Sequence, residues 1–172
     1  MIILGIDPGY DRLGIAIIEK PAKGKEALLY SGCLQTSARD TIYERFQQIG
    51  AETARILDEF KPDALSIETL FITKNQKTAM RVAEARGIIM HEAIRRDVPV
   101  YEYGPMEIKT AITSDGTSDK ERIIKMVRLL VKIPEKSGKK ALDDEYDAIA
   151  VALTHAARAA QNVIHKRQLL QK

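Results

Sequence analysis

The sequence predicts a single α/β domain in which helices flank a mixed β-sheet. Three short β-rich runs lie near the N-terminus, and later apolar runs alternate with amphipathic helical segments. A chain of 172 residues, 45% hydrophobic and 30% charged, has the size and composition of one globular domain. Strands that come first as a group and then alternate with helices are typical of a sheet with both antiparallel and parallel pairs.

Five segments have the short length and β-branched composition of strands. They are residues 2–7, 13–19, 27–36, 64–70 and 98–103. A polar Pro/Gly turn joins the second to the third, so we expect the first three to form an antiparallel meander.

Capping residues and periodicity mark the helices. Thr41 and Glu44 form a capping box, apolar residues then recur every three or four positions to Phe60, and Pro62 ends the helix. Ser118 and Glu121 make a second capping box after a polar loop. Further helices are expected at 75–96, at 105–112, and from about 142 to beyond 160.

Composition excludes several classes of protein. Cys33 is the one cysteine, so the chain has no intramolecular disulfide and no cysteine-rich zinc site. No apolar stretch reaches the roughly 18 residues of a membrane span, and the chain starts directly with a strand. We therefore expect a cytoplasmic protein with no membrane partner, with one domain over residues 1–160 and a basic tail over 161–172.

Four carboxylates stand where apolar elements end or begin. Asp7 and Glu68 each end an apolar run, and Asp144 and Asp147 open an alanine-rich helix. A carboxylate on an apolar strand is costly to bury unless a positive charge faces it. Because no matching buried bases accompany these acids, they predict a divalent cation such as Mg²⁺, which prefers oxygen ligands. The predicted chemistry is metal-assisted phosphoryl transfer.

Each of these acids also has a structural interpretation. Asp7 could cap the turn that follows it, Glu68 could simply sit at its strand end, and acids at a helix N-terminus are stabilised by the helix dipole. Asp143 and Glu145 are alternative ligands, and Asp143 shares a helix face with Asp147 at i, i+4. If the four acids do converge without a cation, mutual repulsion should raise some of their pKa values.

Several short motifs, in order and spacing, match one protein family. They are residues 3–9, 31–33, 67–71, 74–75, 85–87, 99–103, 109, 120, 144–148, 150 and 154–155. On these motifs the chain resembles the RuvC-type Holliday junction resolvases over nearly its whole length. Asp7, Glu68, Asp144 and Asp147 match the four acidic positions of that family.

The resemblance implies an RNase H-like fold with a five-stranded sheet, and a homodimer. The dimer would bind a four-way DNA junction and nick two strands of like polarity, using Mg²⁺. The four carboxylates themselves suit two such ions per active site, and Mn²⁺, which also accepts oxygen ligands, should act as a substitute. Its partners would include the branch-migration helicase complex of the same recombination system.

The resemblance also implies DNA contacts. Lys109 and Lys120 match basic residues near the scissile phosphate, although either could be a solvated surface lysine. Phe71 matches an aromatic residue that acts on bases at the junction centre, although it could also be a core residue. Lys74 and Asn75 follow it in a polar loop suited to the DNA backbone.

Three other functions are compatible with parts of the pattern. A sugar-kinase or actin-like ATPase shares the glycine-bracketed Asp7 motif, but it needs a second similar half for which the chain is too short. An RNase H-type ribonuclease and a catalytically inactive junction-binding module share more of it. The spacing of the acids and the basic segment 109–125 favour the resolvase.

Overall fold

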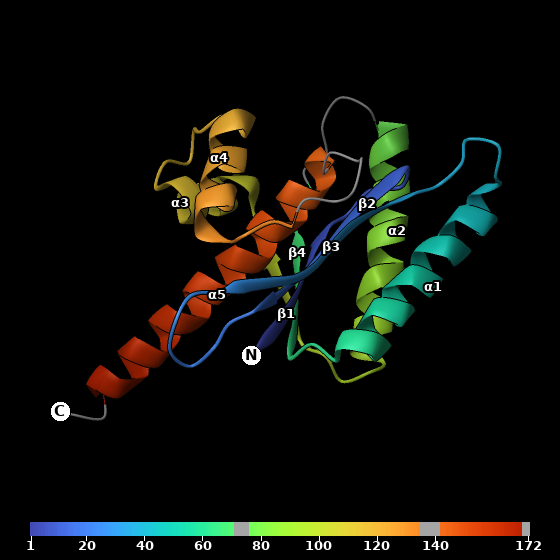
Figure 1. Ribbon diagram of the computed structural model, residues 1–172. Helices are drawn as coiled ribbons and strands as arrows, with labels where there is room; N and C mark the ends of the chain where they lie inside the picture. The colour runs from blue at the N-terminus through green and yellow to red at the C-terminus, as the bar shows by residue number, and fades with distance from the viewer. Residues whose placement is uncertain (71–75, 135–141, 170–172) are drawn as a thin grey trace.

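The computed structural model describes the backbone of residues 1–70, 76–134 and 142–169; side chains are described within these ranges except at 76–77 and 160–169. Helices lie on both faces of a central sheet, so the fold has three layers (Figure 1). The expected mixed α/β architecture is therefore confirmed.

The sheet contains five strands in the order β3-β2-β1-β4-β5. They are β1 (Ile2–Asp7), β2 (Arg12–Glu19), β3 (Ala27–Gln35), β4 (Ala64–Glu68) and β5 (Val100–Tyr103). The first three form the expected antiparallel meander, whereas β4 pairs in parallel with both β1 and β5. Strands β1, β4 and β5 therefore run in the same direction, and their C-terminal ends lie at the same end of the sheet.

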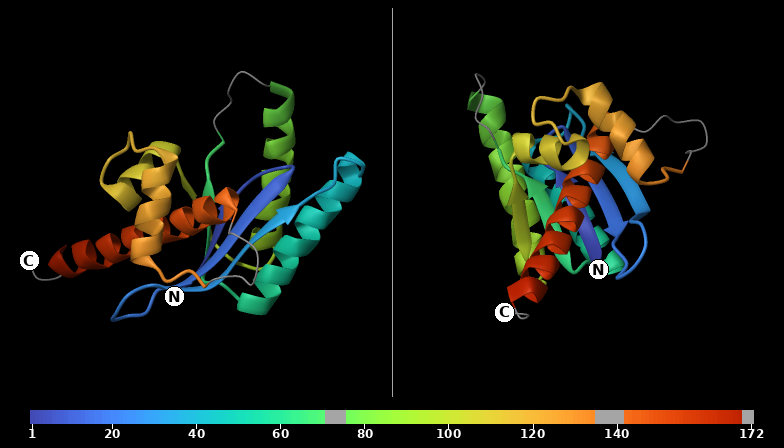
Figure 2. Two further views of the ribbon diagram at one scale, coloured as in Figure 1. Left: turned by 45° about the horizontal axis from the view of Figure 1, so that its top comes forward. Right: turned by 90° about the vertical axis from the view of Figure 1, so that its left-hand side faces the viewer.

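Five helices are described, three of them after the last strand. They are α1 (Ile42–Phe60), α2 (Gln76–Ile94), α3 (Pro105–Thr113), α4 (Lys120–Leu130) and α5 (Asp143–Leu169). Helices α1 and α2 cover one face, and α5 crosses the other with α3 and α4 beside it (Figures 1 and 2). Helix α5 continues into the 161–172 stretch. Within the described residues, no helix is both long and apolar enough to cross a membrane.

Strand β1 is buried on both faces and divides two hydrophobic cores. Ile3 packs in the core shared with α3, α4 and α5, whereas Leu4 and Ile6 pack in the core shared with α1 and α2. Alternate side chains of a strand point to opposite faces. Gly5 and Asp7 therefore belong to the face that α5 covers.

One of the two predicted capping boxes is confirmed. At the start of α1 the Thr41 side chain accepts from the Glu44 amide, and the Glu44 side chain accepts from the Thr41 amide. The capping box at Ser118 is wrong: Asp119 caps α4 by accepting from the Arg122 amide at 2.8 Å. Ser118 is buried instead, and its hydroxyl lies 2.7 Å from that of Thr113, which removes it from the helix end.

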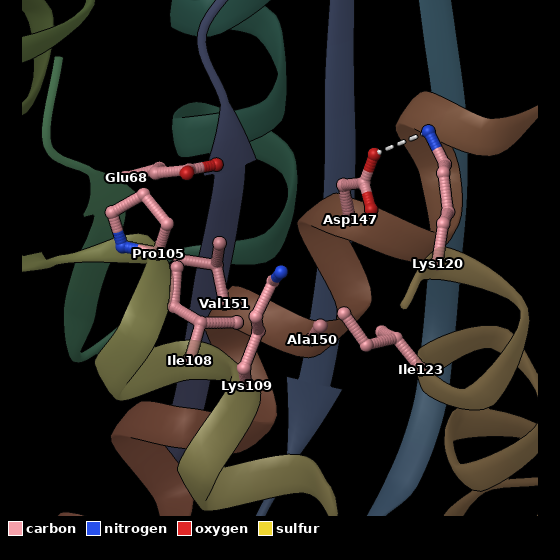
Figure 3. Close-up of a pocket in the computed structure, with 9 residues that line it drawn as sticks. All are labelled: Glu68, Pro105, Ile108, Lys109, Lys120, Ile123, Asp147, Ala150 and Val151. Atoms are coloured by element: carbon pink, nitrogen blue, oxygen red, sulfur yellow. Dashed lines mark hydrogen bonds and ion pairs between the residues drawn. The ribbon is translucent and has the colours of Figure 1, made fainter. Parts of the chain in front are cut away.

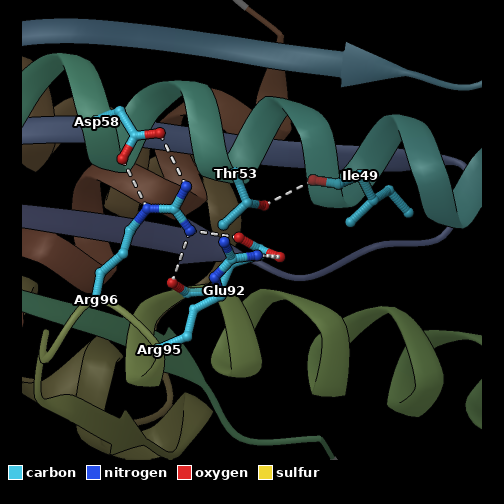
Figure 4. Close-up of polar contacts among 6 residues, drawn as sticks. All are labelled: Ile49, Thr53, Asp58, Glu92, Arg95 and Arg96. Atoms are coloured by element: carbon cyan, nitrogen blue, oxygen red, sulfur yellow. Dashed lines mark hydrogen bonds and ion pairs between the residues drawn. The ribbon is translucent and has the colours of Figure 1, made fainter.

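Arg96, just after α2, joins the ends of α1 and α2 (Figure 4). Its guanidinium donates to both carboxylate oxygens of Asp58 at 2.7 and 2.8 Å, and to the Glu92 carbonyl at 3.1 Å. A two-pronged contact of this kind fixes orientation as well as distance. It holds the two-helix layer together on the face of the sheet away from α5.

Helix α5 packs unusually close to the sheet because small residues line the contact. A Cβ atom added at Gly5 would lie 2.3 Å from the Ala148 carbonyl oxygen, and one at Gly14 would lie 2.1 Å from the Asp144 carbonyl oxygen. Ala148 and Ala152, one turn apart, are both fully buried there. The helix backbone therefore lies directly against β1 and β2.

We expect Gly5→Ala to lower the free energy of unfolding by about 1–3 kcal/mol, because the added methyl group overpacks the α5 contact. Chemical denaturation measures this change. Gly87→Ala is the matched control: a Cβ there meets nothing within 4 Å, and its position inside α2 favours alanine by about 0.5–1 kcal/mol. Equal effects of the two substitutions would contradict the close packing of α5.

Candidate active site

Two of the four predicted acids come together because their strands are parallel neighbours. Ile6 of β1 pairs with Ile67 of β4, so the next residues, Asp7 and Glu68, lie side by side at the C-terminal ends of these two strands. Leu65 and Ile67 pack in the α1–α2 core, which places Glu68 on the opposite, α5-covered face. Arg86 of α2 donates to the Glu68 carbonyl at 3.2 Å and holds the strand end in place.

Asp144 and Asp147 are brought to the same end of the sheet by α5. Gly14 pairs with Asp7 across β1 and β2, and the backbone of Asp144 lies against Gly14. The first turn of α5 therefore sits over Asp7. Asp144 and Asp147, three residues apart, project from one side of that turn.

The electrostatics of Asp7 show that the four acids share one environment. Burial, followed by the negative charges of Asp147, Glu68 and Asp144, raises the pKa of Asp7 to about 7 from an ordinary 3.8, against a lowering by Lys120. Burial and the charge of Asp147 also raise the pKa of Glu68. The expected weakening of the converging acids is thus present at Asp7 and Glu68.

Asp147 carries the same conflict. Burial raises its pKa, the Lys120 ammonium works against that rise, and Asp144 and Asp143 add to it, with a net increase. At the start of α5 the side chain of Asp143 is 64% exposed, compared with 23% for Asp144 and 29% for Asp147, and Glu145 is buried. Asp143 therefore lies furthest toward solvent.

The capping interpretation of Asp7 finds no support. Within the described part of the chain, the Asp7 carboxylate makes no hydrogen bond to the turn at Pro8–Gly9. That turn is held instead by Arg45 of α1, which forms an ion pair with Asp11 and stacks over the Tyr10 ring at 4.6 Å. The Asp7 side chain is left for the site.

Two basic side chains face the acids. Lys120, the first residue of α4, donates to Asp147 Oδ2 at 3.0 Å and lies 3.4 Å from Asp143 Oδ2. Arg12, the first residue of β2, lies 3.6 Å from Asp144 Oδ2. Arg12 is not among the residues predicted from the sequence, because its proximity to Asp144 depends on how α5 docks on the meander rather than on any local motif.

A cleft of about 220 Å³ opens beside the acids. Glu68 and Asp147 line it together with Lys109 of α3 and Lys120 (Figure 3). Its remaining lining is largely apolar, with Ile108, Ile123 and Val151 among the contributors. Four of the predicted site residues thus share one cleft. Phe71, Lys74 and Asn75 lie outside the described residues.

The donor set suits a hard divalent cation in its chemistry, since it consists of carboxylate oxygens on acids that repel one another. Among the described residues, no three His, Cys, Asp or Glu side chains form a ready-made metal cluster. Asp147 and Asp144 are instead turned toward Lys120 and Arg12. Metal binding at this site would therefore require these side chains to reorient.

A buried tyrosine–histidine pair connects β5 to α5 beneath the site. The Tyr103 hydroxyl lies 2.7 Å from His155 Nδ1, and the Tyr101 ring packs on His155 with centroids 4.4 Å apart. Tyr103 pairs with Glu68 across β4 and β5, so the contact joins the Glu68 strand layer to α5. Burial lowers the pKa of His155. Nothing in the sequence indicated that these two residues meet.

Sequence comparison gives a consistent family assignment. The family model for crossover junction endodeoxyribonuclease RuvC matches residues 3–155. A crossover junction endodeoxyribonuclease RuvC from Thermosipho melanesiensis is 44% identical over 155 residues, which cover 88% of this chain and 94% of the relative.

Structural comparison agrees. The Thermus thermophilus RuvC structure matches with a TM-score of 0.84 and 34% identity over 94% of this chain and 97% of that one. T. thermophilus RuvC in complex with Holliday junction substrate matches with a TM-score of 0.86 and 33% identity over 94% and 96% of the two chains. The RNase H-like fold is thereby confirmed, and the chain belongs to the crossover junction endodeoxyribonuclease RuvC family.

Proposed function

We propose that this chain is a structure-selective endonuclease that resolves four-way (Holliday) DNA junctions in homologous recombination and DNA repair. It would do so by paired nicks in two strands of like polarity. The observation that carries the proposal is the placement of Glu68, Asp144 and Asp147 around the buried Asp7, whose pKa is raised to about 7 by burial and by the negative charges of these three acids. Membership of the crossover junction endodeoxyribonuclease RuvC family supplies the substrate class.

Asp7, Glu68, Asp144 and Asp147 are proposed as both the catalytic and the metal-binding residues. Mg²⁺, two ions per active site with Mn²⁺ as a substitute, would activate water and stabilise the leaving oxygen of the cleaved phosphodiester. The chain supplies the oxygen ligands, a rigid strand edge that holds Asp7 and Glu68, and a helix that holds the other two.

DNA binding is proposed for the basic rim of the cleft and for the segment that follows β4. Lys109 and Lys120 line the cleft beside Glu68 and Asp147, where a phosphate would be drawn to their charges. Phe71 would act on bases at the junction centre by stacking, and Lys74 and Asn75 would contact the backbone near it.

A homodimer is proposed because two symmetric nicks require two active sites, and one chain provides one group of four acids. The branch-migration helicase complex of the same recombination system is the proposed further partner.

The alternatives are less well supported. The family match spans 3–155 and favours neither an RNase H-type ribonuclease nor an ATPase. A junction-binding module without catalysis has no need of a group of acids whose burial and mutual repulsion raise the pKa values of Asp7, Glu68 and Asp147. Retaining all four acids has a cost that catalysis explains.

Replacing Glu68 or Asp144 by its amide should abolish junction cleavage and preserve or strengthen junction binding, because the metal-binding charge and its repulsion of phosphate are both removed. Cleavage of a labelled synthetic junction in Mg²⁺ and a gel-shift assay in Ca²⁺ measure the two effects. Glu121→Gln, on exposed α4 surface, is the matched control and should cut normally. Full activity of Glu68→Gln would rule out the proposed site.

Stability of the metal-free protein should fall as pH rises from about 4 to about 7. In that window folded Asp7 retains a proton that the unfolded chain has lost, because its pKa is raised from 3.8 to about 7. The loss is complete above pH 7. Asp7→Asn should remove most of this slope and raise the melting temperature at pH 8, as thermal denaturation would show. A variant less stable than wild type at pH 8 would contradict the raised pKa.

Junction affinity should fall steeply with salt, with a contribution to the log–log slope of about −0.9 for each phosphate contact on duplex DNA. If Lys109 contacts phosphate, Lys109→Ala should make the slope shallower by about one. The control is Lys25→Ala. Lys25 is an exposed residue in the β2–β3 turn, at the end of the sheet opposite the acids. Identical slopes for both variants would remove Lys109 from the DNA interface.

A further inference from the structure

We infer that Lys120 is an exchangeable internal cation: its ammonium neutralises Asp147 in the free protein and has to leave that carboxylate before a divalent metal can bind there. The inference rests on the proposed function, because it assumes that Asp147 is a metal ligand. It adds a step that precedes catalysis, in which one of the chain's own charges is displaced.

The contacts of Lys120 support this role. Its Nζ donates to Asp147 Oδ2 at 3.0 Å, a distance that makes a charged hydrogen bond, whereas Arg12 approaches Asp144 no closer than 3.6 Å. Figure 3 shows the Asp147 carboxylate turned toward the Lys120 ammonium, with Glu68 across the cleft. The ligand atoms of Asp147 are therefore already engaged by a cation.

A metal ion can replace the Lys120 ammonium at Asp147 because only the backbone of Lys120 is fixed and its side chain can move. Lys120 is the first residue of α4, so its backbone is fixed by the Asp119 cap, while half of its side chain is exposed. A half-exposed ion pair contributes little to stability, because water screens its charges. A metal ion that offers several ligand bonds can displace such a contact.

Asp143 gives the displaced ammonium a second position. It lies 3.4 Å from Lys120 Nζ on the same side of α5 as Asp147, and its side chain is the more exposed of the two. The geometry thereby assigns Asp143 as a positioning residue for Lys120 rather than as a metal ligand in place of Asp144. Held at Asp143, the ammonium remains beside the cleft and is available to a DNA phosphate.

Linkage makes the consequence reciprocal. Metal binding releases Lys120 from Asp147 and thereby raises the affinity of Lys120 for phosphate by some factor. Phosphate bound to Lys120 must then raise the affinity of the site for metal by the same factor. The DNA-free protein is thus kept in a state of low metal affinity. Arrival of the substrate would convert it to the metal-binding state.

The test is a titration of the DNA-free protein with Mn²⁺, in which free Mn²⁺ is measured by electron paramagnetic resonance. Lys120→Met should bind Mn²⁺ roughly fivefold more tightly than wild type, at the low end of typical coupling between sites. Lys109→Met is the matched control, since Lys109 lines the same cleft but forms no carboxylate ion pair with the described residues. Lys120→Arg keeps the charge and should stay near wild type.

A second arm localises the effect. In an Asp147→Asn background, Lys120→Met should tighten Mn²⁺ binding no more than Lys109→Met does, because the competing contact is already gone. Equal gains from Lys120→Met and Lys109→Met in the wild-type background would overturn the inference, as would no gain from either. Those results leave the proposed function intact if Glu68→Gln still abolishes junction cleavage, so the two failures are distinguishable.

Discussion

The close contact between α5 and strands β1 and β2 places the first turn of α5 over the acids of the sheet. Gly5 and Gly14 leave no room for a side chain between helix and sheet. Because of this approach, the first turn of α5 sits over the end of β1, and two acids of a distant segment meet Asp7 and Glu68. The same contact builds the core that buries Ala148 and Ala152. This packing interaction therefore sets the geometry of the site and also forms the core on the α5 face of the sheet.

Bringing the acids together opposes stability, and the surrounding structure limits the damage. Asp7 takes the largest burden, with its pKa raised to about 7 by burial and by three neighbouring carboxylates. Lys120 and Arg12 neutralise part of the charge at Asp147 and Asp144. The buried contact between Tyr103 and His155 holds α5 against β5. Storing such repulsion in a folded protein is typical of active sites, where it is relieved by a cation or a substrate.

Much of the fold follows from local patterns in the sequence. The meander is predicted by three short β-rich runs, and the start of α1 by its capping box, because both depend on near neighbours. The second cap is wrong because Thr113 captures the Ser118 hydroxyl. The four acids could be picked out as residues that end or begin apolar elements, but Arg12 and the Tyr103–His155 pair could not. Their contacts exist only after α5 has docked on the sheet, and no short-range signal encodes that docking.

The most direct test of the account is cleavage of a mobile four-way junction, with each of its strands labelled in turn, beside a matched linear duplex. We expect two nicks at symmetric positions in strands of like polarity, only in the presence of Mg²⁺ or Mn²⁺, and little cutting of the duplex. Equal cutting of duplex and junction, or undiminished junction cleavage in excess chelator, would contradict the central claim that Asp7, Glu68, Asp144 and Asp147 form a metal-dependent resolvase site.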